Sequence, residues 1–351
     1  MGDTSIEWTD KTWNPVRGCS RVSEGCRHCY AETVAARFSG PGQPYEGLAK
    51  MVKRDVRQFE SVGGEPTGNF RTVSRSEARW TGAVRFVPEH LADPLRWTKP
   101  RKIFVNSMSD LFHESLEDRW IDEILAVMLL AHWHTYQVLT KRVARMLAYL
   151  SDPGLYARVL NAAALLRAQF PRRRLDQVGI SNPTARPAPW IWWGASVENQ
   201  EAADERIPLL LKTPAAVRFL SCEPLLGSLD IEVHLRRMLQ TADGRLLRNT
   251  DAGAADTAGV WRRPVDWVIA GCESGRGARP AQVDWYRSLR DQCAAAGVPF
   301  FLKQATDVDP AIQPPGGKSP RSGRVVSAPY LDGRQHLEFP AERDEGARGG
   351  G

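Results

Sequence analysis

The stretch IFVNSMSDLFHE, residues 103–114, contains the pattern from which the fold is predicted. An apolar run over residues 103–105 is followed at once by polar residues, among them Asn, Ser and Asp. Similar apolar runs, each followed by polar residues, begin at Tyr136, Trp190, Val217, Trp267 and Pro299. Because these runs lack alternation between apolar and polar residues, they suit strands that are buried on both faces, as in a parallel sheet.

Segments of helical character fit between these runs. We expect Ser115 to cap a helix with one apolar side, and we expect further helices over residues 142–150, 199–212 and 284–296. Repeated strand-then-helix units favour a parallel sheet or a (β/α) barrel, whose C-terminal strand ends meet on one face. The polar residues that follow the strands are therefore expected to form a common site. For any single one of them, the alternative is a helix cap or a solvated loop.

Three segments interrupt this rhythm, near residues 40–81, 152–189 and 230–264. The first is Gly-rich and basic, with Lys50, Lys53, Arg54, Arg57, Arg71, Arg75 and Arg79. The second includes the run PRRR at residues 171–174. We expect residues 1–306 to form one (β/α) barrel domain that carries these insertions. The Pro-, Gly- and Arg-rich tail over residues 307–351 is expected to be disordered.

Composition excludes few classes of function. The chain of 351 residues has 47 Lys and Arg against 41 Asp and Glu, a net charge of +6 that permits a nucleic-acid partner without requiring one. The first ten residues lack the apolar core of a secretory signal, and the apolar stretch over residues 124–133 is too short to span a bilayer. The sequence therefore predicts a cytoplasmic protein without a membrane partner. In that reducing compartment, the six cysteines are expected to be ligands or core residues rather than disulfides.

Three of the cysteines, Cys19, Cys26 and Cys29, lie together in GCSRVSEGCRHCY at residues 18–30. Three thiolates can hold three irons of a [4Fe–4S] cluster and leave the fourth iron open to an exchangeable ligand. Iron–sulfur clusters and S-adenosylmethionine (SAM) belong to the cofactors that carry radical chemistry. The loop therefore predicts a metal site at which chemistry can occur.

Other uses of these cysteines stay open. Cys26 and Cys29 have the spacing of half a structural zinc site, with Cys19 and His28 nearby. His28 is badly placed between two ligands of one tetrahedral ion, so Cys293 or a distant His is the candidate fourth ligand. Such a protein would be a non-catalytic, zinc-stabilised nucleic-acid-binding protein. A redox-active pair of Cys26 and Cys29 would leave Cys19 without a role. A cluster that works without SAM would make the chain an electron-transfer protein.

Two further cysteines follow apolar runs, in SCEP at residues 221–224 and in GCES at residues 271–274. Cys222 and Cys272 are each either a small buried hydrophobic residue or a catalytic hydrogen-atom donor or covalent acceptor. Cys293 is expected in the core.

Much of the chain outside the insertions and the tail resembles the phage-associated three-cysteine-motif proteins, a family usually labelled as a domain of unknown function. The resemblance is carried by IEWTDKTWNPVRGC, FVNSMSDLFHE, YQVLTKR, GASVENQEAADERIP, VRFLSCEPLLG, WVIAGCESGRGARP and SLRDQCAAAGVPFFLKQ. The family is itself similar to the radical SAM superfamily, and its nearest look-alikes include enzymes of the spore photoproduct lyase type.

This resemblance implies a partial (β/α) barrel of radical SAM type, with the cluster in the loop after the first strand. SAM would chelate the open iron through its amino and carboxylate groups. One-electron reduction by a flavodoxin or ferredoxin would cleave SAM to methionine and a 5′-deoxyadenosyl radical that abstracts a hydrogen atom from the substrate. The chain departs from the commonest C-x3-C-x2-C spacing of the superfamily, because six residues separate Cys19 from Cys26.

The resemblance also assigns residues to the site by position. Cys19, Cys26 and Cys29 are the expected metal ligands, and His28 stands where an aromatic residue often packs on the adenine. Expected cofactor contacts are Asn106, Ser107, Ser109 and Asp110 for the SAM amino group, Ser196, Glu198 and Asn199 for the ribose, and Glu223 and Glu273 for SAM or substrate. Lys141, Arg142 and Lys303 are candidates to neutralise a carboxylate or phosphate, and Cys222, Cys272 and Lys303 are the candidate catalytic residues. The phage association and the basic insertions suggest DNA, RNA or a nucleotide as the substrate.

Overall fold

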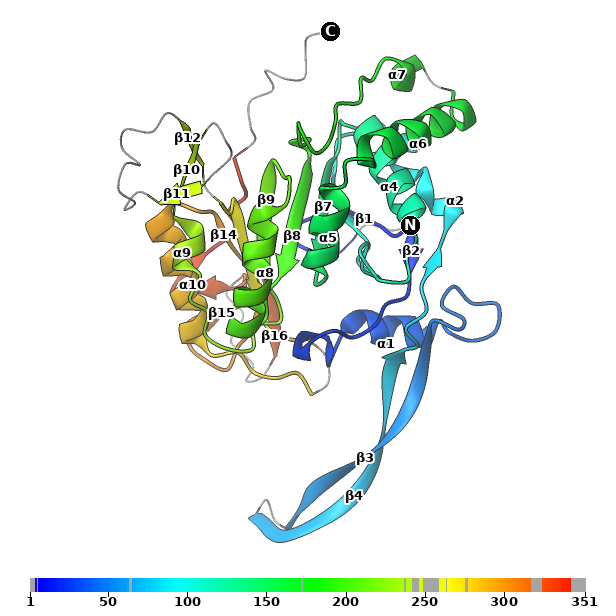
Figure 1. Ribbon diagram of the computed structural model, residues 1–351. Helices are drawn as coiled ribbons and strands as arrows, with labels where there is room; N and C mark the ends of the chain where they lie inside the picture. The colour runs from blue at the N-terminus through cyan, green and yellow to red at the C-terminus, as the bar shows by residue number, and fades with distance from the viewer. Residues whose placement is uncertain are drawn as a thin grey trace.

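An eight-stranded sheet that curls into a half barrel forms the centre of the computed structural model (Figure 1). The strands follow chain order across the sheet, and each of the first six pairs in parallel with the next. The eighth strand pairs antiparallel with the seventh. In order across the sheet they are β1 (Lys11–Trp13), β6 (Lys102–Val105), β7 (Thr135–Thr140), β8 (Ile191–Ser196), β9 (Val217–Cys222), β13 (Trp267–Gly271), β14 (Phe300–Thr306) and β16 (Val325–Ser327).

The structure describes residues 4, 6–62, 65–171, 173–236, 238–241, 246–248, 259–262, 264–274, 277–316 and 324–341. The predicted mixed α/β fold with a partial barrel is confirmed at this level, and each predicted apolar run contributes to a strand of the sheet. None of the helices within these ranges is long and apolar enough to cross a membrane.

Helices connect the successive parallel strands. They are α4 (Asp118–Leu130), α5 (Val143–Leu150), α6 (Leu155–Gln169), α7 (Arg173–Asp176), α8 (Gln200–Lys212), α9 (Glu232–Leu235) and α10 (Val283–Ala296). Three of the predicted helices are confirmed within one residue at their starts, and Gly297 ends α10 in the left-handed conformation with φ of 64°. The prediction for Ser115 is wrong: Glu117 is the N-cap of α4, and no side chain caps that helix.

The sheet is buried on both faces, as the apolar runs predicted. Alternate residues of a strand point to opposite faces. Ile103 and Val105 of β6 belong to the large core shared with the helices, whereas Phe104 belongs to a second core inside the half barrel. Trp267 is fully buried at the centre of that inner core, among other aromatic rings.

Gly194 on β8 is a point at which the inner core tolerates no side chain. A Cβ atom there would lie 2.4 Å from the Phe219 ring, and that ring packs against Trp267 at a centroid distance of 5.8 Å. We expect Gly194→Ala to lower the free energy of unfolding by about 1–3 kcal/mol because overpacking forces neighbours to shift. Chemical denaturation measures this loss. Gly179→Ala is the control, since a Cβ at Gly179 has open space; equal stability of the two variants would contradict the packing argument.

The segment before β6 carries the cysteines and the first insertion. It contains β2 (Val16–Arg17), η1 (Glu24–Cys26), α1 (Tyr30–Arg37), β3 (Ala49–Val62), β4 (Glu65–Trp80), β5 (Arg85–Phe86), α2 (Pro88–Leu91) and α3 (Asp93–Arg96). β2 pairs with β5. β3 and β4 form a long two-stranded ribbon that projects away from the barrel (Figure 1).

The later insertions also contain regular structure. Helix α6 of the second insertion packs on α4. The third insertion forms a three-stranded sheet of β10 (Met238–Thr241), β11 (Leu246–Arg248) and β12 (Gly259–Arg262).

The predicted disorder of residues 307–351 is wrong for the part that the structure describes. Besides β16, this part contains β15 (Ile312–Gln313), β17 (Tyr330–Leu331) and β18 (Arg334–Gln335), which pair with one another. Ile312 and Leu331 are buried, and the Phe339 ring lies 5.1 Å from that of Trp267. A few apolar residues in a polar segment thus have burial sites on the barrel, which average composition does not reveal. Residues 342–351 lie outside the described residues.

Candidate cofactor-binding site

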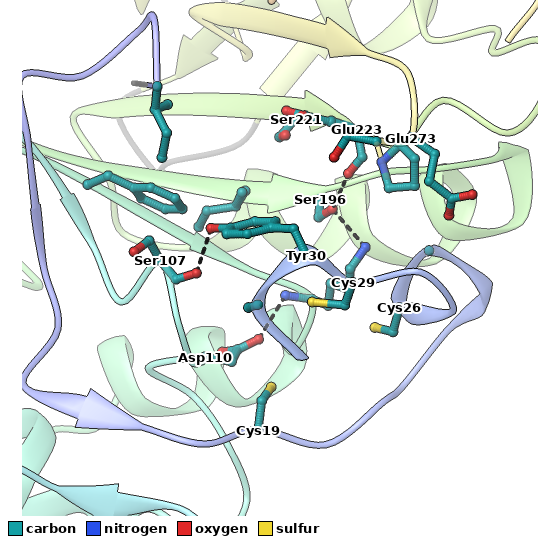
Figure 2. A pocket seen from close by; sticks show the side chains of 18 of the residues that line it. Cys19, Cys26, Cys29, Tyr30, Ser107, Asp110, Ser196, Ser221, Glu223 and Glu273 are labelled. Carbon is teal, nitrogen blue, oxygen red and sulfur yellow. Dashed lines mark hydrogen bonds between the residues drawn. The ribbon is translucent and has the colours of Figure 1, made fainter. Parts of the chain in front are cut away.

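The cysteine loop follows β1 and β2, as the resemblance implied, and lies at the C-terminal ends of the parallel strands. Cys19 comes two residues after the end of β2, Cys26 ends the short helix η1, and Cys29 is the N-cap of α1. All three line one cavity of about 460 Å³, together with residues from the ends of β6, β7, β8, β9 and β14 (Figure 2). The expected convergence of strand ends on one site is therefore present.

The donor set of this loop is three thiols, and thiolates are ligands both of zinc and of iron–sulfur clusters. One zinc ion at about 2.3 Å from each sulfur would need the three sulfurs within roughly 4 Å of each other. Among the residues that the structure describes, no three His, Cys, Asp or Glu side chains are grouped to hold one metal ion, and Figure 2 shows the three thiols apart from one another. A cluster binds each thiolate through a different iron, so three separated thiols that face one cavity suit it.

Two of the three thiols in the loop, those of Cys19 and Cys29, have raised pKa values. Burial raises the pKa of the Cys19 thiol to about 12; nearby Asp110 adds to this rise, and Arg142 opposes it. Burial also raises the pKa of Cys29, while the backbone N–H groups of Glu32 and Ala31 lower it. Metal binding at this loop must therefore displace protons.

Arg142 joins the cysteine loop to the end of β7. Its guanidinium is buried and donates to Asp110 Oδ2 at 3.1 Å and to Ser20 Oγ at 2.7 Å. One of its nitrogens also lies 3.8 Å from the Cys19 sulfur. The Asp110 carboxylate further accepts from Thr140 Oγ1 and from the backbone of Lys141. Asp110 thus lies at the cavity, as predicted, but protein donors already occupy both of its oxygens.

A second ion-pair network packs against the cysteine loop. Lys141 Nζ donates to Ser196 Oγ at 2.8 Å and to Glu198 Oε2 at 2.9 Å, and Arg206 donates to the same carboxylate at 2.9 Å. Burial favours the neutral form of Glu198, but the two cations outweigh it and hold its pKa at about 2. A Cβ on Gly25 would lie 2.9 Å from both Glu198 and Lys141. A side chain at position 25 would therefore require Glu198 and Lys141 to move from these positions.

Glu273, after β13, joins the opposite side of the barrel to the loop. It is almost fully buried, lies 2.7 Å from His28 Nδ1, and accepts from Arg279 Nη2 at 2.6 Å. Arg279 also donates to the backbone oxygen of Glu24. Burial raises the pKa of Glu273, but its hydrogen bonds to Arg279 and His28 lower it below the ordinary value overall. His28 and Glu273 both line the cavity, and they are bonded to each other.

Asn106, at the end of β6, is an unpartnered polar side chain in the cavity wall. It is 3% exposed, and neither its Oδ1 nor its Nδ2 has a hydrogen-bond partner among the described residues. Its φ of 59° is left-handed, a conformation that asparagine tolerates. Leaving buried polar atoms without partners costs about 1–3 kcal/mol. A polar ligand in the cavity would satisfy both atoms.

The neighbouring serines differ from Asn106 in this respect. Ser107 Oγ donates to Asn14, and Ser109 Oγ donates to the Val16 backbone oxygen. Tyr30 donates to the Ser107 backbone oxygen at 2.7 Å. Both serines line the cavity, and their side chains bond to residues at the end of β1 and in β2; their predicted contact with SAM stays a prediction.

Glu223 lies across the cavity from Cys19 (Figure 2). Lys303 Nζ donates to Glu223 Oε1 at 2.5 Å. The pairing of β13 with β14 shifts register between Ala270 and Gly271; both Lys303 and Gln304 line the cavity beside it. Cys272 also lines it, and burial, with nearby Glu223, raises the pKa of that thiol to about 12.

Three of the predicted site residues do not line the cavity. Cys222 is fully buried in the core shared with the helices. Asn199 caps α8 by accepting from the Ala202 backbone at 2.9 Å. Glu198 lies beneath the loop, in the Lys141 and Arg206 network. For Asn199, the helix cap considered as an alternative is what the structure contains.

Other lining residues were missed by sequence reasoning. They include the aromatic residues Trp8, Tyr30, Trp80 and Phe104, together with Ser221 and Gln304. Tyr30 follows Cys29 directly in sequence, a signal that could have identified it.

Comparison with known proteins gives a family and no activity. A family model described as "Protein of unknown function (DUF5131)" matches residues 3–340. No curated protein and no solved structure was found to match the chain. The prediction of a family labelled as a domain of unknown function is thereby confirmed.

Proposed function

The chain belongs to the DUF5131 family, and we propose that it is a SAM-dependent [4Fe–4S] enzyme that modifies a nucleic acid or nucleotide by radical chemistry. One observation carries the proposal: three thiols of one loop and an unpartnered buried amide, Asn106, line the same cavity at the ends of parallel strands. This is the face of a (β/α) fold on which catalytic groups are found. The link to radical SAM enzymes and the phage association rest on the sequence resemblance alone.

The residues divide between holding the cofactors and shaping the cavity. Cys19, Cys26 and Cys29 would hold the cluster, and Arg142, at 3.8 Å from the Cys19 sulfur, would stabilise thiolate charge. When bound, a reduced cluster with SAM supplies hydrogen-atom abstraction by a carbon-centred radical. An external reductant of the flavodoxin or ferredoxin type would deliver the electron.

The cavity has the size and lining of a cofactor site. Its volume of about 460 Å³ lies within the usual range for small-molecule pockets, roughly 300–1,000 Å³. Trp8, Phe104 and Leu139 give it apolar walls on which an adenine could pack. Asn106 offers one donor group and one acceptor to the polar part of SAM. Glu223 and Lys303, which face the cavity away from Cys19, would contact the substrate.

Cleavage of SAM tests the proposal. Anaerobically reconstituted protein, reduced with dithionite, is expected to convert SAM to methionine and 5′-deoxyadenosine, both measured by chromatography. Protein that contains iron and sulfide but cleaves no SAM would support the electron-transfer alternative. Colourless protein with stoichiometric zinc would support the nucleic-acid-binding alternative. Either result would overturn the proposed function.

Asn106→Gly tests the predicted contact with SAM. Glycine keeps the left-handed backbone but removes the amide, so SAM affinity is expected to fall about tenfold, given roughly 1 kcal/mol for each lost hydrogen bond. Iron content should stay the same. The free energy of unfolding should not fall, because the variant removes two unsatisfied polar atoms. Equilibrium dialysis with labelled SAM measures the affinity. Unchanged SAM affinity would contradict the assigned role. So would a loss in the free energy of unfolding as large as the loss in the free energy of SAM binding.

A further inference from the structure

The two-stranded ribbon of β3 and β4, here called the arm (residues 49–62 and 65–80), is much longer than its packing requires. β3 has 14 residues and β4 has 16, and the ribbon extends away from the barrel (Figure 1). Consecutive residues Lys53, Arg54 and Asp55 are all exposed, so both faces of the ribbon meet solvent there. An isolated pair of strands has no core to stabilise it. Packing therefore does not explain the length of the arm.

One face of the arm is basic. Residues directly opposite each other on paired strands lie on the same face; Lys50 stands opposite Arg79, and Arg54 stands opposite Arg75. Glu77, between these pairs, is the one acidic residue among them and lies 3.0 Å from Arg79 and 4.0 Å from Arg54. Among these five residues, four cations stand against one anion, an excess of three positive charges.

This arrangement works against the stability of the ribbon. Like charges directly opposite each other destabilise an antiparallel pair by roughly 0.2–1 kcal/mol, and here two such pairs follow one another on one face. Lys50, Arg54 and Arg75 are also exposed. A polyanion laid along the face would remove the repulsion. The charge pattern therefore points to a partner that carries regularly spaced negative charges.

The base of the arm lies at the cavity. Trp80, the last residue of β4, lines the cavity, and its backbone N–H donates to Glu32 Oε1 at 3.1 Å. Glu32 belongs to α1, which begins directly after Cys29, and is paired with Arg21 of the cysteine loop. A partner bound along the arm would thus be held next to the cysteine loop.

We propose that the arm binds duplex DNA through its phosphate backbone and holds it at the cavity. A two-stranded ribbon fits the major groove of B-form DNA, about 12 Å wide, whereas the major groove of A-form RNA is too deep and narrow for side chains to enter. Binding by the arm does not require the cofactors. Only the assignment of DNA as the substrate class rests on the proposed function.

The test compares the salt dependence of DNA binding in two charge-matched variants of the full chain. The arm variant carries Lys50→Gln, Arg54→Gln and Arg75→Gln, and it keeps the Arg79–Glu77 pair. The control variant carries Arg119→Gln, Arg236→Gln and Arg334→Gln, which are exposed arginines on α4, after α9 and on β18. Fluorescence anisotropy with a labelled duplex of random sequence, titrated at several salt concentrations, gives the slope of log Kobs against log salt.

The arm variant is expected to bind at least tenfold more weakly than wild type at about 50 mM salt, with a slope smaller by about 2–3 because each phosphate contact contributes about 0.9. The control variant should stay within about twofold of wild type, since nonspecific charge effects are weaker away from the contact surface. Equal losses in both variants, no duplex binding by wild type, or tighter binding of duplex RNA or single strands would overturn the proposal.

The same preparations separate this inference from the proposed function. If wild type binds duplex DNA through the arm but contains no iron, the proposed function fails and the arm assignment stands. If the arm variant cleaves SAM like wild type and DNA binding is equal in all three proteins, the arm assignment fails and the proposed function stands. The thermal stability of the arm variant should equal or exceed that of wild type, because the variant removes like-charge repulsion.

Discussion

Cys26→Ala is expected to abolish the bound iron and sulfide and, with them, the cleavage of SAM. Cys26 is one of three thiols that face the cavity from a single loop, and the other three cysteines are buried outside that loop. Substituting a residue that only hydrogen-bonds to a metal ligand lowers metal affinity roughly 10–100-fold. Removing a ligand itself should lower metal affinity by more than this. Iron and sulfide assays after anaerobic reconstitution measure the effect.

Cys293→Ala is the matched control for this prediction. Cys293 is fully buried in α10 and belongs to the core shared with the helices. Its loss removes a thiol from the protein without touching the cysteine loop, so iron content should equal that of wild type. A Cys26→Ala protein that retains full iron, or a Cys293→Ala protein that loses it, would show that the cluster is held elsewhere.

Asp110→Ala is expected to lower the free energy of unfolding by about 3–5 kcal/mol, the cost of breaking a buried ion pair from one side. The side chains of Asp110 and Arg142 are 8% and 6% exposed and lie 3.1 Å apart. The substitution also removes the acceptor for Thr140 Oγ1 and for the backbone of Phe112 and Lys141. Chemical denaturation of the metal-free protein measures the loss.

Glu114→Gln tests whether the expected loss in Asp110→Ala comes from the burial of that ion pair or from pairing with Arg142 alone. Glu114 Oε1 lies 2.8 Å from Arg142 Nε, closer than Asp110 does, but its side chain is 64% exposed. Exposed ion pairs contribute about 0–1 kcal/mol, so Glu114→Gln should change stability little. If Glu114→Gln and Asp110→Ala lower the free energy of unfolding equally, burial does not explain the contribution of the Asp110–Arg142 pair.

The strands were predictable because they are buried on both faces. Runs such as the one at residues 103–105 are apolar throughout, since Phe104 fills the inner core while Ile103 and Val105 face the helices. The position of the site followed from the same pattern, because the ends of parallel strands converge. Hence Asn106 and Glu223, which follow different strands, line one cavity.

The orientation of individual side chains was not predictable. In β9 the residues Ser221 and Cys222 are adjacent, and only Ser221 lines the cavity. Adjacent residues of a strand face opposite sides, so a shift of one residue exchanges them, and the sequence does not reveal which one faces inward. Asn199 was ambiguous for another reason: asparagine serves equally as a ligand contact and as a helix cap, and here it caps α8.

The arm and the tail could not be predicted from composition. A two-stranded ribbon needs no apolar periodicity, so the basic residues around Arg54 indicated only an insertion. In the tail, three apolar residues that are far apart in sequence, Ile312, Leu331 and Phe339, find contacts on the barrel or on each other's strands. Such contacts depend on tertiary structure and leave no local signal.

On the proposed function, the cysteine loop holds a [4Fe–4S] cluster with an iron open to SAM. Electron paramagnetic resonance of anaerobically reconstituted, dithionite-reduced protein, recorded with and without SAM, tests it most directly. We expect a [4Fe–4S]⁺ signal that changes when SAM is added and is absent from Cys26→Ala. A cluster signal that SAM leaves unchanged, or a colourless protein that holds only zinc, would contradict it.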